Sequence, residues 1–259
     1  MSTVPTTARE GGLDAPTRHP LDWKNPEFHD QALLDKELER VFHICHGCRR
    51  CVSLCNAFPT LFDLVDESST MEVDGVAKSD YVKVVEQCYL CDLCYQTKCP
   101  YIPPHPWDVD FPHLMLRAKA TAHRRGETGF AARLLSNTTT VGKLASIPLA
   151  VNVVNAANRN PTARKLIDKA LGVDPRARVP DYHSDTARRR LRGMDAAIAT
   201  PVAAGRTRGK VALFVTCYCN YSQPQAVEDL VAVFRHNGVG IKLIEREVCC
   251  GMPKFELGD

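Results

Sequence analysis

The sequence lacks the long apolar runs that carry a protein into or across a membrane. None of its uncharged stretches reaches the roughly 20 apolar residues that span a bilayer. The first twenty residues contain neither the apolar stretch of a secretory signal nor a twin arginine. These absences predict a cytoplasmic protein, with the inner face of the membrane as the alternative location.

Nucleotide-binding and hydrolytic signatures are also missing. No G-x-G-x-x-G loop follows a candidate strand, there is no Walker loop, and no Ser/His/Asp or paired-carboxylate arrangement stands out. Without a bound flavin or nicotinamide, the chain cannot transfer a hydride by itself. With 44% hydrophobic and 24% charged residues, it has the composition of a globular protein. No catalytic residue is therefore predicted.

Cysteine, in contrast, is abundant. The 12 cysteines form three groups of four: Cys45, Cys48, Cys51, Cys55; Cys88, Cys91, Cys94, Cys99; and Cys217, Cys219, Cys249, Cys250. In a reducing cytoplasm, clustered cysteines hold metal more often than they pair as disulfides. The cysteines are therefore candidate metal ligands.

The first two groups have the spacing of a two-cluster ferredoxin. Three cysteines two residues apart let a loop curl around one [4Fe–4S] cluster, whose negative charge the backbone N–H groups of the loop stabilise. The fourth cysteine lies beyond the loop and, in two-cluster ferredoxins, binds the other cluster. The sequence thus predicts one cluster on Cys45, Cys48, Cys51 and Cys99 and a second on Cys88, Cys91, Cys94 and Cys55.

Two details depart from that pattern. Four residues instead of three precede Cys99, and Asn56 rather than proline follows Cys55. Neither departure removes a ligand. Zinc is the alternative metal, but zinc sites pair two C-x2-C knuckles. Two separate runs of three cysteines with the spacing C-x2-C-x2-C are very unusual for zinc. His43 and His46 flank the first loop and are expected to pack or to support ligands.

The segments around the first two groups have helical patterns. Apolar residues recur at helical spacing over residues 33–42, a similar run at 79–88 leads into the second group, and a further helix is expected over 108–125. Residues 1–18 are expected to be disordered. Residues 19–126 are predicted to form an all-helical two-cluster ferredoxin domain, which resembles that of the iron–sulfur subunits of succinate dehydrogenase-like complexes.

Residues 127–208 are predicted to be a basic helical linker. Residues 114–210 carry 19 Lys and Arg against 6 Asp and Glu, which favours an acidic partner or an anionic membrane surface, with a solvated surface as the alternative. Nucleic acid is not expected, because aromatic residues are few and no recognition motif occurs. Residues 144–158 are an uncharged run of 15. We expect a buried helix there, with a helix in the membrane interface as the alternative.

The last section changes to α/β character. Residues 210–216 and 240–246 are predicted strands, and the helix expected over 223–238 joins them into one parallel βαβ unit. Cys217 follows the first strand, and the pair Cys249 and Cys250 follows the second. Because ligands in open α/β sheets bind at the carboxyl ends of the strands, these three cysteines are expected to meet at one edge.

At these residues the sequence resembles the CCG-domain iron–sulfur proteins related to heterodisulfide reductase. This family includes the C subunit of anaerobic glycerol-3-phosphate dehydrogenase and the iron–sulfur subunits of glycolate and lactate oxidases. The resemblance rests on the two ferredoxin motifs, on residues 215–225 (VTCYCNYSQPQ) and on residues 248–259 (VCCGMPKFELGD).

The resemblance implies that Cys217, Cys249 and Cys250 are candidate ligands of a third, non-cubane cluster. In the family that site also uses a downstream C-x-x-C, which this chain does not reach. Residues 209–259 are therefore expected to be an incomplete CCG domain in a truncated chain, with a third cluster only if the remainder is present. Cys219 has no place in the motif and is expected to be a small buried residue.

Electron transfer is the predicted function of this mixed α and α/β chain. Fully ligated cubanes have no open coordination site, so they carry electrons rather than bind substrate. We expect an iron–sulfur subunit that passes electrons from a flavoprotein dehydrogenase to a quinone or another acceptor. Two alternatives stay open: a disulfide-reductase-like catalytic subunit that uses a CCG cluster, and a non-redox, metal-stabilised adaptor.

Overall fold

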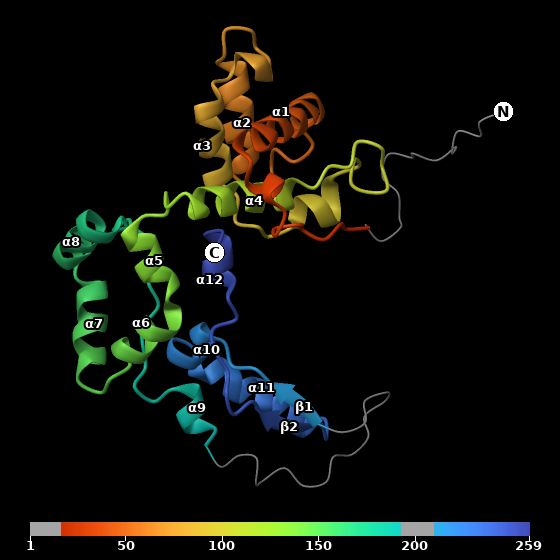
Figure 1. Cartoon of the computed structure of the whole chain (residues 1–259). Coiled ribbons are helices and arrows are strands. Elements are labelled where there is room, and N and C mark those ends of the chain that lie inside the picture. The colour runs from red at the N-terminus through yellow and green to blue at the C-terminus, as the bar shows by residue number, and fades with distance from the viewer. Residues whose placement is uncertain (1–16, 193–209) are drawn as a thin grey trace. The chain divides into compact units, whose positions relative to one another are not determined.

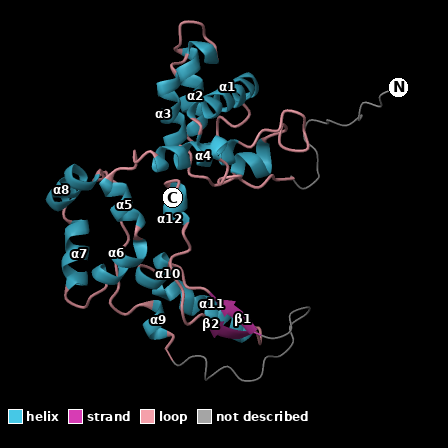
Figure 2. Ribbon diagram, in the orientation of Figure 1, coloured by secondary structure: helices cyan, strands magenta, loops and turns pink. Residues whose placement is uncertain are grey.

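The computed structural model describes residues 17–192 and 210–259, and the chain forms two compact units. The first unit contains the residues up to 128 together with 255–259, and the second contains residues 129–254 (Figure 1). Most described elements are helices, and two short strands lie in the second unit (Figure 2). The mixed α and α/β composition expected from the sequence is therefore confirmed.

Helices connected by short turns build the first unit. The main helices are α1 (Gln31–Cys48), α2 (Ala57–Asp66), α3 (Tyr81–Glu86) and α4 (Phe111–Arg124). The turns are η1 (Pro26–His29), η2 (Val73–Gly75), η3 (Lys78–Asp80) and the π turn η4 (Cys94–Lys98). Helices are thus present where the sequence predicts them over 33–42, 79–88 and 108–125.

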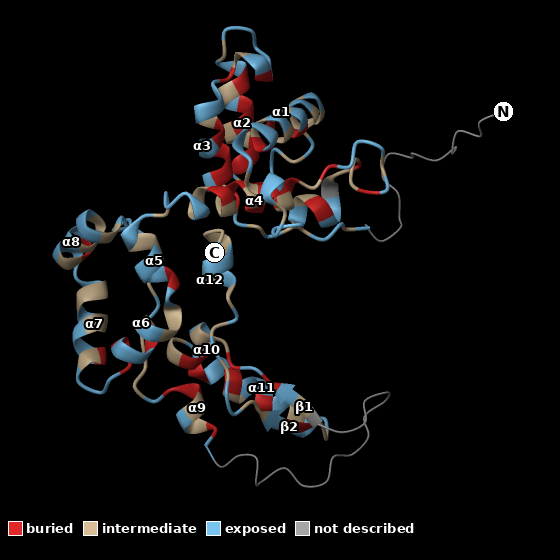
Figure 3. Cartoon of the chain, in the orientation of Figure 1, coloured by how far each residue is buried: buried red, intermediate tan, exposed pale blue. Residues whose placement is uncertain are grey.

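One apolar core holds these helices together. Buried residues, coloured red in Figure 3, gather where α1 to α4 meet. Phe42 is fully buried, its ring centroid lies 5.0 Å from that of Tyr81, and Phe58 and Phe111 are 4.7 Å apart. Burying an aromatic side chain of this kind stabilises the fold by about 2 kcal/mol or more. The core directly adjoins the cysteine loops, because Cys45, Cys51, Cys55, Cys94 and Cys99 pack against it.

The Arg18 side chain holds the first described residues against this unit. The Arg18 guanidinium lies 2.6 Å from a carboxylate oxygen of Asp92 and 2.8 Å from one of Asp110, and it stacks 4.4 Å from the Tyr95 ring centroid. The Tyr95 hydroxyl donates to the Thr17 carbonyl at 3.1 Å. The end of the segment expected to be disordered is therefore held in place, and the remainder lies outside the described residues.

The second unit combines a helical region with the βαβ segment. Its helices are α5 (Phe130–Ser136), α6 (Thr138–Ala145), α7 (Ala150–Arg159), α8 (Pro161–Leu171), α9 (Ala187–Arg190), α10 (Cys217–Tyr221) and α11 (Pro224–His236), and α12 (Met252–Glu256) begins in it. The strands are β1 (Lys210–Leu213) and β2 (Gly240–Leu243). The region expected as a linker and the CCG segment thus lie in one compact unit.

The parallel βαβ arrangement predicted for the CCG segment is present, with shorter strands. β1 pairs with β2 in parallel, and Leu213 lies opposite Leu243. The ladder stops there because the Val215 N–H donates to a carboxylate oxygen of Glu247 at 2.9 Å, a side-chain acceptor instead of a backbone one. Residues 214–216 and 244–246 are therefore outside the strands.

The uncharged run 144–158 does not form the single buried helix that we expected. α6 ends at Ala145, two residues into the run, α7 begins at Ala150, and the two axes are bent by 107°. Pro148 lacks an amide hydrogen and its ring crowds the preceding turn, which accounts for the break. Leu144, Leu149 and Val153 are 60%, 85% and 70% exposed, so the expectation of a buried helix is wrong.

No single helix among the described residues is long and apolar enough to cross a membrane. The bent pair of α6 and α7 meets the length and composition limits only when its two halves are taken together.

Many arginines of the basic stretch meet acidic or carbonyl oxygens within the second unit. Buried Arg164 donates to the carbonyl oxygens of Asp174 at 2.7 Å and Ala177 at 3.0 Å. The ion pairs are Arg159 with Asp181, Arg176 with Asp174, Arg188 with Glu247, and Arg190 with Asp185 and Glu228. Many of the positive charges noted in the sequence therefore form contacts within this unit.

α6 packs unusually close to α10 through a glycine. A Cβ atom built on Gly142 would lie 2.2 Å from the Tyr221 ring, a distance that real side chains do not tolerate. We expect Gly142→Ala to destabilise the second unit by about 1–3 kcal/mol, because it overpacks this contact. Thermal or urea unfolding measures the change.

Gly129→Ala is the matched control, because a Cβ there meets nothing within 4 Å. Equal unfolding midpoints for the two variants would contradict the packing argument.

Candidate functional site

The first cysteine group begins on a helix and continues in the loop after it. Cys45 and Cys48 belong to the last two turns of α1, whereas Cys51 and Cys55 follow the helix. Arg49 ends α1 in the left-handed conformation, with φ at 50°, and its N–H donates to the Cys45 carbonyl at 2.8 Å. This reversal turns the chain back toward the helix end.

The second group is shaped by two further left-handed residues. Cys88 follows α3, and Leu90 and Asp92 on either side of Cys91 have φ values of 53° and 62°. Such a conformation costs a non-glycine residue about 1–2 kcal/mol, so it persists only where surrounding contacts impose it. The ion pair from Arg18 to Asp92 is one such contact.

The extra residue before Cys99 is accommodated by a π turn. Cys94 begins η4, and the Cys99 N–H donates to the Cys94 carbonyl at 2.9 Å, a bond from residue i+5 to residue i. Turns of this kind are rare and occur frequently at functional sites. The four-residue spacing that departs from the ferredoxin pattern thus has a structural explanation.

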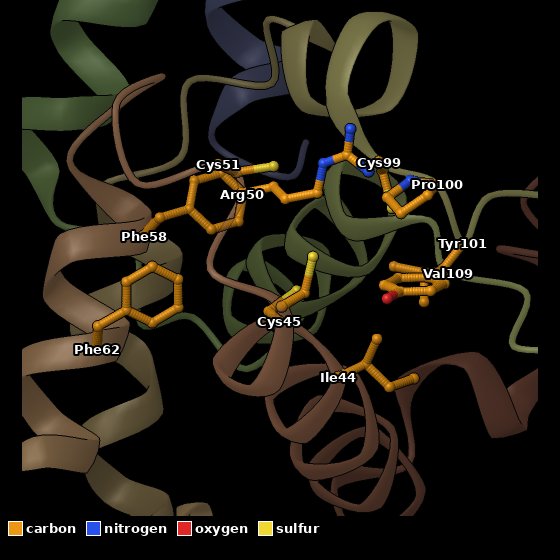
Figure 4. A pocket seen from close by; sticks show the side chains of 11 residues that line it. Ile44, Cys45, Arg50, Cys51, Phe58, Phe62, Cys99, Pro100, Tyr101 and Val109 are labelled. Atoms are coloured by element: carbon orange, nitrogen blue, oxygen red, sulfur yellow. The ribbon is translucent and has the colours of Figure 1, made fainter. Parts of the chain in front are cut away.

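The two groups meet at a small apolar cavity. Cys45, Cys48, Cys51 and Cys99 line a space of about 20 Å³, together with aromatic and aliphatic side chains and Arg50. Figure 4 shows Phe58 and Phe62 on one side of Cys45, and Cys99, Pro100 and Tyr101 on the other. A neighbouring cavity is lined by Cys45, Cys51, Cys94 and Cys99. The four cysteines predicted for one cluster thus line the same cavity. Their role as ligands stays a prediction.

Burial is the main influence on the pKa of four of these thiols, and it raises each of them: Cys45, Cys88, Cys94 and Cys99. Burial raises the pKa of the Cys45 thiol, and the thiols of Cys99 and Cys51 raise it further. Burial also raises the pKa of Cys88, which Cys55 and Cys91 raise further while the Leu90 N–H and Lys119 lower it. A metal centre must therefore displace protons and supply positive charge to bind here.

Thiols in an apolar setting suit an iron–sulfur cluster, which binds each cysteine at a different iron. Within residues 17–192 and 210–259, no three His, Cys, Asp or Glu side chains are placed to hold a metal ion. His43 is exposed, and His46 lies 2.9 Å from an Arg49 nitrogen and 3.9 Å from a Glu72 oxygen. Both histidines lie outside the cavity lining.

The third cysteine group lies at the edge where the two strands end. Cys217 begins α10, and it lines a cavity of about 280 Å³ together with Cys249 and Cys250. Tyr182, Tyr218 and Tyr221 are also in the lining. Cys219 is partly buried and packs against the core of this unit instead.

Two threonines that sequence reasoning missed complete this third site. The Thr138 hydroxyl lies 3.4 Å from the Cys249 sulfur, and the Thr139 hydroxyl lies 3.5 Å from the Cys217 sulfur. The hydrogen bond from Thr138 is the largest of the causes that lower the pKa of Cys249, ahead of the Gly251 N–H. The two partners are 111 residues apart in the first contact and 78 residues apart in the second. No local sequence pattern could therefore predict these contacts.

A largely buried ion pair fixes the loop that carries Cys249. The Glu247 side chain is 7% exposed and pairs with Arg188. Arg188 also donates to the Ile244 and Glu245 carbonyl oxygens at 2.5 and 3.0 Å, and its own N–H donates to Asn220 at 3.0 Å. One arginine from α9 therefore connects the loop after β2 with α10.

We expect Arg188→Met to destabilise the second unit by about 3 kcal/mol, because it leaves the Glu247 carboxylate buried without its cation. Urea unfolding measures the loss. The control is Arg189→Met, one residue along α9, where the side chain is exposed and donates to the Ser184 carbonyl oxygen. A similar loss in both variants would contradict a specific role for Arg188.

Comparison with known proteins supports this view of the third group. The CCG family, described as a cysteine-rich domain, matches residues 211–258. The C subunit of anaerobic glycerol-3-phosphate dehydrogenase from Escherichia coli K12 is 33% identical over 153 residues, or 59% of this chain and 36% of that protein. The chain thus spans just over a third of that relative. No solved structure matches it.

Two further relatives are similar over shorter segments. Citrate utilization protein B of Escherichia coli is 27% identical over 90 residues, or 35% of this chain and 21% of that protein. Lactate utilization protein A of Shouchella clausii is 40% identical over 48 residues, or 18% of this chain and 20% of that protein. Residues 211–258 thus match the CCG cysteine-rich domain, and these relatives support the resemblance to CCG-domain iron–sulfur proteins that the cysteine motifs indicate.

Proposed function

We propose that the chain is an electron-transfer subunit with two [4Fe–4S] clusters. Cys45, Cys48, Cys51 and Cys99 hold one cluster, and Cys88, Cys91, Cys94 and Cys55 hold the other. The subunit takes electrons from a flavoprotein dehydrogenase and passes them to a quinone or another acceptor.

The cavity shared by the two groups is the observation that carries this proposal. Three cysteines of the first group and the last cysteine of the second line it. An exchange of the fourth ligand is the arrangement of two-cluster ferredoxins, which brings two clusters close in one small domain. One relative is the C subunit of anaerobic glycerol-3-phosphate dehydrogenase, and this similarity supports a redox partner protein for the chain.

The chain's own residues set the environment of the clusters. A bound cluster accepts and donates one electron at a time. Phe58, Phe62 and Val109 keep water from the first site. The Lys119 ammonium donates to the Cys88 carbonyl at 2.5 Å and places a positive charge beside the second site. Such a charge favours the reduced, more negative state of a cluster.

Metal analysis of the anaerobically purified chain tests the proposal. We expect about eight irons and eight acid-labile sulfides in the two clusters, and reoxidation of the reduced chain by a water-soluble quinone. Two zinc ions without sulfide would instead support the metal-stabilised adaptor. Reduction of a disulfide substrate that depends on Cys249 would support the disulfide-reductase alternative.

Paired substitutions test which cysteines share a cluster. We expect Cys99→Ala with Cys45→Ala to lose about four irons, because both residues serve the same cluster, and Cys99→Ala with Cys88→Ala to lose about eight. Iron counts and electron paramagnetic resonance of the remaining cluster give the answer. The reverse pattern would show that the fourth ligands are not exchanged.

We also propose that the chain docks on an anionic membrane surface through the turn between α6 and α7. Leu144, Leu149 and Val153 are exposed in and beside this turn, and so are Lys143 and Arg159 at the ends of the run, of which Arg159 also pairs with Asp181. Apolar side chains beside cations are the combination that binds the interface of anionic bilayers.

Flotation with vesicles of phosphatidylcholine and phosphatidylglycerol tests the docking surface. We expect Leu149→Asp with Val153→Asp to weaken binding about tenfold or more, because two apolar side chains that would enter the bilayer interface are lost. Leu166→Asp on α8, where the leucine is 64% exposed, is the control. Equal binding of all three proteins would remove this proposal and leave the electron-transfer proposal untouched.

A further inference from the structure

The start of α6 faces the sulfur atoms of the CCG site. Thr138 and Thr139 are the first two residues of the helix, and each approaches a different cysteine. Thr138 is 3.4 Å from Cys249, which follows β2, and Thr139 is 3.5 Å from Cys217, which follows β1. One helix end thus contacts the cysteines from both strands.

The chemistry of the two groups is complementary. A threonine hydroxyl has a proton to donate, whereas a deprotonated or metal-bound sulfur offers only lone pairs. Hydrogen bonds to ligand sulfurs orient the ligand and tune the potential of iron–sulfur sites.

Close packing fixes the position of these hydroxyls. Gly142, one turn after Thr139, lies so near Tyr221 that a Cβ would fall 2.2 Å from the ring. Tyr221 belongs to α10, the helix that Cys217 begins, and its carbonyl accepts from the His183 N–H at 2.8 Å. α6 is therefore held against the element that carries a cysteine of the site.

We propose that Thr138 and Thr139 are positioning residues for a metal centre on Cys217, Cys249 and Cys250. Each hydroxyl donates to one sulfur and holds it as a ligand. The region before the CCG segment thereby contributes to the CCG site, although its sequence contains no metal ligand. The proposal rests on the iron–sulfur role of the CCG cysteines and is independent of the two clusters in the first unit.

The experiment uses the full chain, reconstituted anaerobically with iron and sulfide. The iron lost in Cys249→Ala defines the iron held at the CCG site. Thr138→Val with Thr139→Val removes both hydroxyls and keeps the branched shape, whereas Thr138→Ser with Thr139→Ser keeps the hydroxyls. The readouts are the rate at which an excess of EDTA removes the CCG-site iron and the midpoint potential of its electron paramagnetic resonance signal.

We expect the valine pair to release this iron about 10-fold faster, at the lower end of the 10- to 100-fold effects of outer-shell partners on metal affinity. Its potential should move to more negative values, while the serine pair behaves as the unchanged chain. Equal release rates in the valine pair and the unchanged chain would overturn the proposal, as would equal acceleration in both pairs, which would indicate packing alone.

A third result would also overturn it: the same iron content in Cys249→Ala and in the unchanged chain, which would mean that no centre forms at these cysteines. That result differs from a failure of the proposed electron-transfer function, which would show as missing iron and sulfide at the first two cysteine groups.

Discussion

A cysteine must lose its proton to bind a metal, and burial opposes that loss. This constraint applies to the cysteines of the first unit. Its cysteines lie beside an aromatic core, and burial together with neighbouring thiols raises the pKa values of Cys45, Cys88, Cys94 and Cys99. Only a cationic centre makes their deprotonation favourable. The cluster sites proposed for the first unit therefore combine an enclosing apolar wall with a need for the positive charge that a bound centre would supply.

The third site meets the same constraint in a different way. Cys249 is less enclosed, and hydroxyl and backbone donors favour its charged form. The surrounding cavity is larger, about 280 Å³ compared with about 20 Å³ at the first group. Two cysteine environments of opposite character thus occur in one chain. One is enclosed and apolar, whereas the other is roomier and bordered by hydroxyl groups.

Local sequence patterns predicted the elements that depend on nearby residues. The helices before the first two cysteine groups and the parallel βαβ unit follow from periodicity and from the order of the segments. The site at the strand ends follows from topology, because parallel strands present their carboxyl ends at one edge. The spacing of the cysteines also predicted as one set the four cysteines that line the first cavity.

Features that depend on distant contacts could not be predicted in this way. Thr138 and Thr139 reach cysteines far away in sequence, and nothing in their surroundings distinguishes them from ordinary helix residues. The apolar run at 144–158 has the composition of a buried helix, yet Pro148 divides it and much of its apolar surface stays exposed. Composition indicates that a segment is apolar but not which surface will cover it.

The π turn between Cys94 and Cys99 bears on how such proteins are recognised. A widened turn absorbs one residue while a single hydrogen bond still joins the two cysteines at its ends. Insertions at this point therefore change the written motif without changing which residues meet. A search pattern that fixes three residues between these cysteines would pass over chains that fold in this way, and one that allows three or four would retain them.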